Sequence, residues 1–176
     1  RGEVWRNRMV RAGWGTCLLC DVALQPTGAL LVERPDILYD DFERETYGDW
    51  TLEGTAFGTG PICQDRVPPY QGDLGMHGHR AVNSHAAAPG GDVRSRDAAT
   101  GTLTSRPFRV ERRWIRLLLG GGADAEHTCV ELLVEGRVVA RVAGRNGNRM
   151  TTVFISAAEW EGREACLRIL DRGEGS

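Results

Sequence analysis

The chain has 176 residues, enough for one domain with a hydrophobic core but too few for a catalytic domain beside a separate binding domain. Its 22 basic and 24 acidic residues give a net charge of −2, and neither sign is concentrated, which argues against a nucleic-acid partner. Apolar runs such as residues 114–119 are far shorter than the roughly 20 residues that a membrane helix requires, so no membrane partner is expected.

The first 35 residues do not carry the pattern of a domain. Arg, Trp and apolar residues mix there without a sustained period, and Pro35 disfavours a helix that would run into it. We expect residues 1–35 to be a non-domain segment or the remnant of a preceding region. Cys17 and Cys20 have the spacing of half a zinc site or of a redox motif, but nothing completes it, and coincidence in an apolar stretch is the alternative. The start at Arg1, without Met or an export signal, predicts a fragment.

From Ile37 onward, short runs of β-branched, aromatic and aliphatic residues are separated by Gly, Pro, Asn and Asp. This pattern, together with 23 glycines, is typical of short antiparallel strands joined by tight turns. We therefore predict an all-β fold, an antiparallel β-sandwich formed by residues 36–176. The expected strands cover residues 37–42, 49–53, 81–84, 101–104, 114–119, 129–134, 137–142, 150–155 and 165–171.

The clearest local signal is a hairpin between residues 130 and 142. Two apolar runs flank Glu135 and Gly136, a two-residue connection suited to a primed hairpin turn. Because both faces of these runs carry apolar side chains, we expect the hairpin to lie inside the sandwich rather than at a half-solvated edge.

Residues 61–101 are rich in Gly, Pro, Asp and His, which predicts long surface loops. Loops held by a rigid sandwich are where a ligand site is usually built. The pair His77 and His79 could bind a metal if Asp73 or Asp92 supplied a third ligand, and a solvated polar loop is the alternative.

The residues give no strong sign of an enzyme, because no Ser-His-Asp set, carboxylate pair or metal cluster stands out. Sugar binding needs an aromatic face for the C–H surface of a ring and planar polar groups for its hydroxyls. Two clusters supply both kinds of group, and their aromatic members could equally be core residues: Tyr47, Asp49 and Trp50, and then Arg112, Arg113 and Trp114.

Carboxylates near the ends of predicted strands could hold a structural calcium ion, which prefers oxygen ligands. The candidates are Asp40, Asp41, Glu43 and Asp171, and solvated turn residues are the alternative.

Several motifs, in the same order along the chain, resemble a known family. They run from Tyr39 to Asp171 and include Tyr39-Asp40-Asp41-Phe42-Glu43, Tyr47-Gly48-Asp49-Trp50, residues 54–61, Gly72-Asp73-Leu74-Gly75, Val82-Asn83-Ser84, residues 100–108, Glu111-Arg112-Arg113-Trp114-Ile115, Gly120-Gly121-Gly122 and residues 128–139. This series resembles the levanase-type family 66 carbohydrate-binding modules, which occur beside glycoside hydrolase family 32 (β-fructosidase) domains.

The resemblance implies a jelly-roll or galactose-binding-like sandwich that binds fructan, such as levan, through terminal fructose without cleaving it. The chain would then be part of a secreted enzyme, extracellular or periplasmic, with an adjacent catalytic propeller domain, and no cofactor beyond a structural Ca²⁺. The alternative is a sandwich that packs against a glycosidase domain without binding sugar.

Carried over residue by residue, the resemblance predicts a set of carbohydrate-binding side chains, namely Glu43, Tyr47, Asp49, Asn83, Arg112 and Arg113. Two parts of the chain depart from the family, residues 62–69 and the His-rich residues 77–85. The family pattern also continues past Asp171, so we expect the last strand to be missing and one sheet edge to be open.

Overall fold

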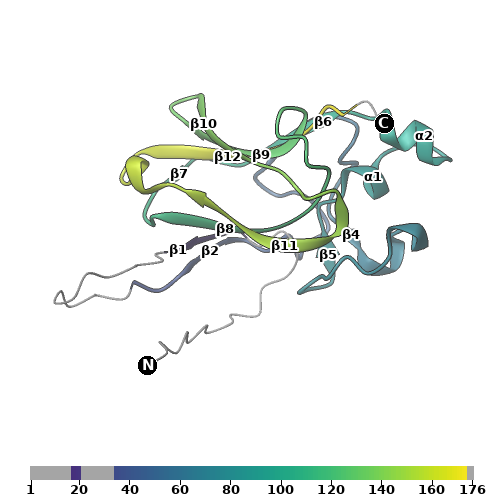
Figure 1. The fold of residues 1–176 in the computed structure, drawn as a ribbon, viewed down its shortest axis with the longest axis horizontal. Coiled ribbons are helices and arrows are strands. Elements are labelled where there is room, and N and C mark those ends of the chain that lie inside the picture. Colours follow the sequence, from purple (N-terminus) through teal and green to yellow (C-terminus); the bar gives the residue numbers. More distant parts are fainter. Residues whose placement is uncertain (1–16, 21–33, 174–176) are drawn as a thin grey trace.

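The computed structural model describes residues 17–20 and 34–173. These residues form two antiparallel sheets that face each other as a sandwich (Figure 1). The prediction of an all-β antiparallel sandwich is therefore confirmed. The N-terminal end of the described chain and the strands β2 and β8 lie in the lower layer of this view, and β9, β10 and β12 lie in the upper layer.

The smaller of the two facing sheets has the strand order β11-β8-β1-β2. Its strands are β1 (Cys17–Cys20), β2 (Ile37–Asp40), β8 (Trp114–Gly121) and β11 (Gly147–Ser156). The larger sheet has the order β10-β9-β12-β6-β3, and β7 also pairs with β12. Its strands are β3 (Thr51–Gly54), β6 (Gly101–Thr104), β7 (Phe108–Arg109), β9 (Thr128–Val134), β10 (Arg137–Val142) and β12 (Glu164–Asp171).

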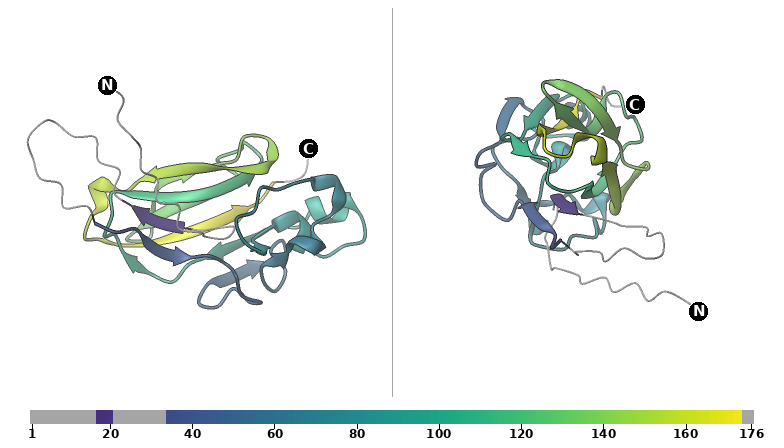
Figure 2. Two further views of the ribbon diagram at one scale, coloured as in Figure 1. Left: turned by 90° about the horizontal axis from the view of Figure 1, so that it is seen from below. Right: turned by 90° about the vertical axis from the view of Figure 1, so that its left-hand side faces the viewer.

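The short helices α1 and α2 and the small two-stranded sheet of β4 and β5 gather at one end of the sandwich (Figures 1 and 2). Among the described residues, no helix is both long and apolar enough to cross a bilayer. These elements are β4 (Ile62–Cys63), β5 (Arg80–Ala81), α1 (Ser84–Ala87) and α2 (Val93–Asp97), with 3₁₀ turns at Gln64–Arg66, Pro69–Gln71 and, after β11, Ala158–Trp160.

The hydrophobic core lies between the two sheets. Ile115 and Ile155 from the smaller sheet, and Leu103, Leu132 and Leu167 from the larger one, are all fully buried. Each alternates along its strand with outward-facing residues, as the pleat of a strand requires. Burial of a side chain of this size stabilises a fold by about 1.5–3 kcal/mol, so this layer supplies much of the driving force.

One strand comes from the segment that we expected to lie outside the domain. β1 is hydrogen-bonded on one side to β2 and on the other to β8, with Leu19 opposite both Ile37 and Ile115. Without it, β2 and β8 would each present an unpaired edge here. For residues 17–20 the expectation is therefore corrected, and the remainder of residues 1–33 lies outside the described residues.

The strand predicted for residues 81–84 ends sooner than expected. β5 stops at Ala81, and α1 begins at Ser84. Asn83 explains the change, because its side-chain oxygen accepts hydrogen bonds from the backbone N–H groups of His85 (3.1 Å) and Ala86 (2.9 Å). This is the N-cap arrangement that favours the start of a helix over the continuation of a strand.

The predicted hairpin is present. β9 and β10 pair from Val134 opposite Arg137 to Val130 opposite Val142. The two connecting residues adopt positive φ, 52° at Glu135 and 77° at Gly136, as a type I′ turn requires.

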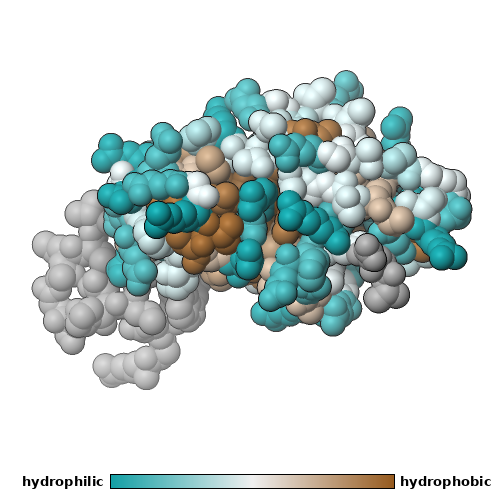
Figure 3. All heavy atoms as spheres, turned by 90° about the horizontal axis from the view of Figure 1, so that it is seen from above, coloured by the Kyte–Doolittle hydropathy of each residue, from teal (hydrophilic) through white to brown (hydrophobic). Residues whose placement is uncertain are grey.

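The prediction that the whole hairpin lies inside the sandwich is wrong for its second strand. β10 stands at the end of the strand order, so only β9 borders it, and Val138 is 36% exposed. Figure 3 looks onto the side of the molecule that carries β10, β9 and β12, and it shows apolar surface there between hydrophilic side chains. A sequence with apolar residues on both faces of a strand therefore fits two cases, a buried strand and an edge strand whose apolar face is partly exposed.

We predict that Gly136→Ala lowers the free energy of unfolding by about 1 kcal/mol, because an L side chain is strained at this φ. No atom lies within 4 Å of the added methyl group, so the cost comes from the backbone alone. Gly122 is the matched control, since a Cβ there also meets nothing within 4 Å and its φ is outside the left-handed region. Urea unfolding measures both variants, and an equal loss of stability in the two would contradict the prediction.

Candidate functional site

The residues predicted to bind sugar do not form one site, and Tyr47 is the clearest correction. It is 4% exposed and belongs to the main core. Its phenol donates a hydrogen bond to the carbonyl of Phe57 (2.7 Å), and burial raises the pKa of this phenol. Neither the ring face nor the hydroxyl is available to a ligand.

Arg112 is also committed within the protein. Its side chain is buried, and its guanidinium donates to the carbonyl oxygens of Pro35 (2.8 and 3.1 Å) and Glu111 (2.9 Å). It therefore fixes the entry of the chain into β2 rather than an open binding surface, which corrects the prediction. Arg113 is exposed, and its carbonyl accepts a hydrogen bond from the backbone of Ala157 (2.8 Å).

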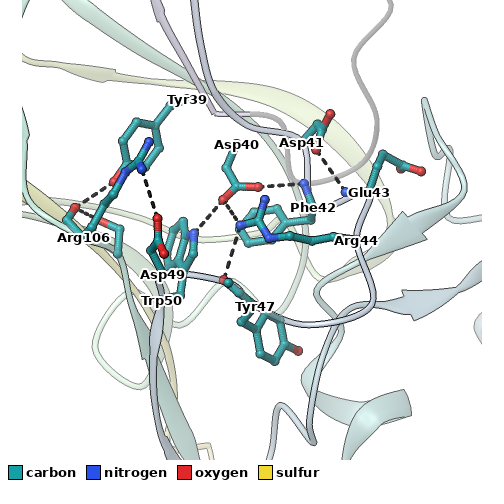
Figure 4. Close-up of polar contacts among 12 residues, drawn as sticks. Tyr39, Asp40, Asp41, Phe42, Glu43, Arg44, Tyr47, Asp49, Trp50 and Arg106 are labelled. Atoms are coloured by element: carbon teal, nitrogen blue, oxygen red, sulfur yellow. Dashed lines mark hydrogen bonds and ion pairs between the residues drawn. The ribbon is translucent and has the colours of Figure 1, made fainter.

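Two of the predicted carboxylates hold loops. Glu43 accepts hydrogen bonds from the backbone N–H groups of His79 (2.9 Å) and Arg80 (3.1 Å), so it anchors the start of β5. Asp49 is exposed and forms an ion pair with Arg106 (3.0 Å). Arg106 in turn lies over the ring of Tyr39 (Figure 4).

Asp40 is buried at the end of β2, and three donors surround it (Figure 4). Its carboxylate accepts from Trp50 Nε1 (2.7 Å), from the backbone of Phe42 (2.8 Å) and from Arg44 Nη2 (2.5 Å). Trp50 is 8% exposed and belongs to the main core, so of the two roles considered for it the structure shows the core role. Trp114 instead is half-buried and packs edge-on against Phe154, with ring centroids 6.4 Å apart.

The described residues do not fit the expected metal sites. Asp41 accepts from the backbone of Glu43 (3.0 Å) and Asp171 from that of Gly173 (3.3 Å), so these carboxylates, like Asp40, are engaged by protein donors. No group of three or more His, Cys, Asp or Glu side chains in the described part of the chain could hold a metal ion, neither around the proposed calcium ligands nor around His77 and His79. Calcium therefore stays a prediction without a site among these residues.

The structure places a cleft of about 520 Å³ between the two sheets, at the end that carries α1 and α2. Some of its lining residues are apolar and buried, and we take them as its inner part: Phe42, Trp50, Phe57, Leu117 and Leu167. Other lining residues are polar and at least partly exposed, and we call them its rim: Gln71, Asn83, His85, Asp97 and Asn148. Of the predicted sugar-binding residues, Asn83 lines this cleft.

Gln71 joins the two sides of the polar rim. Its side-chain oxygen accepts from Asn83 Nδ2 (3.0 Å), and its carbonyl accepts from Asn148 Nδ2 of β11 (3.1 Å). Within the described residues, the amide nitrogen of Gln71 makes no hydrogen bond. The rim thus offers amide groups to a ligand at positions that are already fixed.

Two residues of this rim, His85 and Asp97, form a chain of three side chains with Tyr70. Nδ1 of His85 lies 2.6 Å from Asp97 Oδ1, and Nε2 lies 2.7 Å from the hydroxyl of Tyr70. A carboxylate only accepts, so Nδ1 donates to Asp97, and in the neutral imidazole Nε2 then accepts the proton of the phenol. We call these residues the Tyr70-His85-Asp97 chain. Sequence reasoning missed it, although its members lie in the loop segment where a site was expected.

No family model matches the chain, and no solved structure matches it significantly. The chain is 25% identical over 138 residues to a protein of Aspergillus rugulosus described as "Putative glycosyl hydrolase ecdE". The alignment covers 77% of this chain but spans only 18% of that relative.

Asp40→Ala should lower the free energy of unfolding by about 3 kcal/mol, because it leaves the buried indole N–H of Trp50 without an acceptor. Asp41→Ala is the matched control, since that carboxylate accepts a single backbone hydrogen bond, and a loss below about 1 kcal/mol is expected. Denaturant unfolding monitored by tryptophan fluorescence compares them. Equal losses would show that Asp40 is not the critical acceptor.

Tyr47 predicts a dependence of stability on alkaline pH. The pKa of its phenol is raised in the folded protein, so above about pH 10 the unfolded chain loses this proton while the folded chain keeps it. Stability should therefore be unaffected below that pH and fall as the pH rises beyond it. Tyr47→Phe should flatten this fall, whereas Tyr39→Phe, which leaves Tyr47 in place, should retain it. Urea unfolding between pH 8 and 11.5 makes the comparison, and identical slopes for both variants would count against the prediction.

Proposed function

We propose that this chain is a noncatalytic carbohydrate-binding module of a glycosidase-related protein and that the cleft between its sheets receives the sugar. The observation that carries the proposal is that the cleft is lined both by buried apolar side chains and by polar side chains, amides among them, that are at least partly exposed. A sugar presents both kinds of surface, because its C–H groups are apolar and its hydroxyls form hydrogen bonds in pairs. The similarity to a relative whose printed description is that of a glycosyl hydrolase supports the sugar as the ligand class.

A fructan is the most specific ligand that we propose, and the support for it is the ordered series of motifs that resemble levanase-type modules. On this proposal the chain belongs to a secreted β-fructosidase with an adjacent catalytic propeller domain, which would cleave the polymer while this module holds it. Terminal fructose would be the bound unit.

The surroundings of the carboxylates at the cleft support a role in binding rather than in cleavage. Asp97 is hydrogen-bonded to the imidazole of His85 and Asp124 to that of His127 (2.8 Å). Asp171 accepts a hydrogen bond from the backbone of Gly173 (3.3 Å). A glycosidase needs one carboxyl group to protonate the leaving oxygen and another to act as base or nucleophile. Carboxylates that hold neighbouring loop groups are poorly placed for either task.

Isothermal titration against levan, inulin and fructose tests the proposal, with cellulose and xylan oligosaccharides as comparison ligands. We predict that a fructan binds and that Gln71→Ala and Asn83→Ser each weaken binding about tenfold, by removing an amide from the rim. Serine keeps the N-cap oxygen of α1, so the second variant should fold normally.

Asp49→Ala is the matched control, because Asp49 is a predicted sugar ligand that does not line the cleft. A loss of binding in this variant alone would place the site at Asp49 and its neighbours, which Figure 4 draws. No heat above dilution for any sugar would favour a sandwich that only packs against a catalytic domain. Release of reducing sugar by the chain alone would contradict the noncatalytic role.

A further inference from the structure

Tyr70 is the most exposed large aromatic side chain among the described residues. It is 58% exposed, whereas Phe154, the next aromatic ring in this respect, is 45% exposed. Covering this ring with a ligand would remove apolar surface from water, which is favourable. The ring stands next to the cleft, because Gln71, the next residue, and His85, its hydrogen-bond partner, both line it.

The side chain of Tyr70 is held in place although it is exposed. Its hydroxyl lies 2.7 Å from His85 Nε2, and Asp97 holds the opposite nitrogen of the same imidazole. The two rings meet edge to face, with centroids 5.7 Å apart and an angle of 83° between their planes. A ring fixed in this way loses little conformational freedom when a ligand packs on it.

The backbone that carries Tyr70 is fixed as well. Pro68 and Pro69 precede it and restrict φ, and two turn hydrogen bonds close the 3₁₀ turn, from Gln71 to Pro68 (2.9 Å) and from Gly72 to Pro69 (3.1 Å). Asn148 of β11 then binds the carbonyl of Gln71 (3.1 Å). The ring, the rim amides and the sandwich therefore form one connected unit.

We propose that Tyr70 is a stacking platform for one face of a neutral sugar ring, beside the unit that enters the cleft, and that His85 and Asp97 are positioning residues for this platform. The inference rests on the proposed function and adds a contact residue that the sequence motifs did not indicate. A neutral sugar suits the surroundings, because the C–H face of its ring packs on an aromatic face and no net charge has to be buried.

The test compares Tyr70→Ala, Tyr70→Phe and Phe154→Ala by isothermal titration with levan oligosaccharides. We expect Tyr70→Ala to weaken binding about tenfold or more, because it removes the whole platform. Tyr70→Phe keeps the ring but loses its hydrogen bond to His85, so we expect about a threefold loss. Phe154→Ala removes an exposed ring on β11 and should leave the affinity unchanged.

A second measurement reports contact directly. The chain has three tyrosines, and Arg44 and Arg66 separate them, so that trypsin places each on a different peptide. Tyr47 is buried and Tyr39 is half-buried, whereas Tyr70 is exposed, so tetranitromethane should nitrate Tyr70 fastest. Bound levan oligosaccharide should slow the nitration of Tyr70, whereas a cellulose oligosaccharide should not.

The outcomes separate this inference from the proposed function. If the wild-type chain binds levan oligosaccharides but Tyr70→Ala binds equally well, or Tyr70 is nitrated at the same rate with ligand, the stacking role is wrong and the proposed function stands. If the wild-type chain binds no sugar, both are wrong. Equal losses for Tyr70→Ala and Phe154→Ala would also overturn the specific role of Tyr70.

Discussion

The buried carboxylate of Asp40 is the interaction on which the interior of the cleft depends. It holds the indole of Trp50 and the backbone of Phe42, whose φ of 56° is one that L residues rarely adopt. The rings of Phe42 and Trp50 lie 5.1 Å apart, and both line the inner part of the cleft. A charge in this place is tolerated because Arg44 and two N–H groups surround it. The shape of the apolar interior is thus fixed by a polar group beneath it.

The strands could be predicted where the signal is local. Alternation of apolar residues and turn residues located the β9–β10 hairpin and most of the sandwich, because a strand must bury one face and a type I′ turn favours glycine. β1 could not be found in this way, since four apolar residues show no period and the strand forms only because β2 and β8 border it. The edge position of β10 likewise depends on the strand order, which the sequence does not state.

The site was harder to predict than the fold, and Tyr47 and Arg112 show the reason. In the sequence, a tyrosine or arginine that binds sugar cannot be told from one that donates a hydrogen bond to a backbone carbonyl inside the protein. The carbonyl that Tyr47 binds belongs to Phe57, and the one that Arg112 binds belongs to Pro35, 77 residues away. Such partners are known only from the tertiary structure. The loop composition between residues 61 and 101 predicts a ligand site there, and Gln71, Asn83, His85 and Asp97, which line the proposed cleft, all come from this segment.

Long loops often make poor binding surfaces, because ordering them on a ligand costs conformational entropy. Here that ordering is already supplied by contacts with the sandwich. Three successive residues of β11 hold the loop: Asn148 binds the carbonyl of Gln71, Arg149 pairs with Asp73, and the backbone of Met150 donates to Leu74 (3.0 Å). Glu43 holds the same loop at its other end through the backbone of His79 and Arg80. Glu43 therefore holds a loop that lines the cleft although it does not line the cleft itself. On the proposed function, the affinity for a sugar should depend on these ties as much as on the groups that contact it.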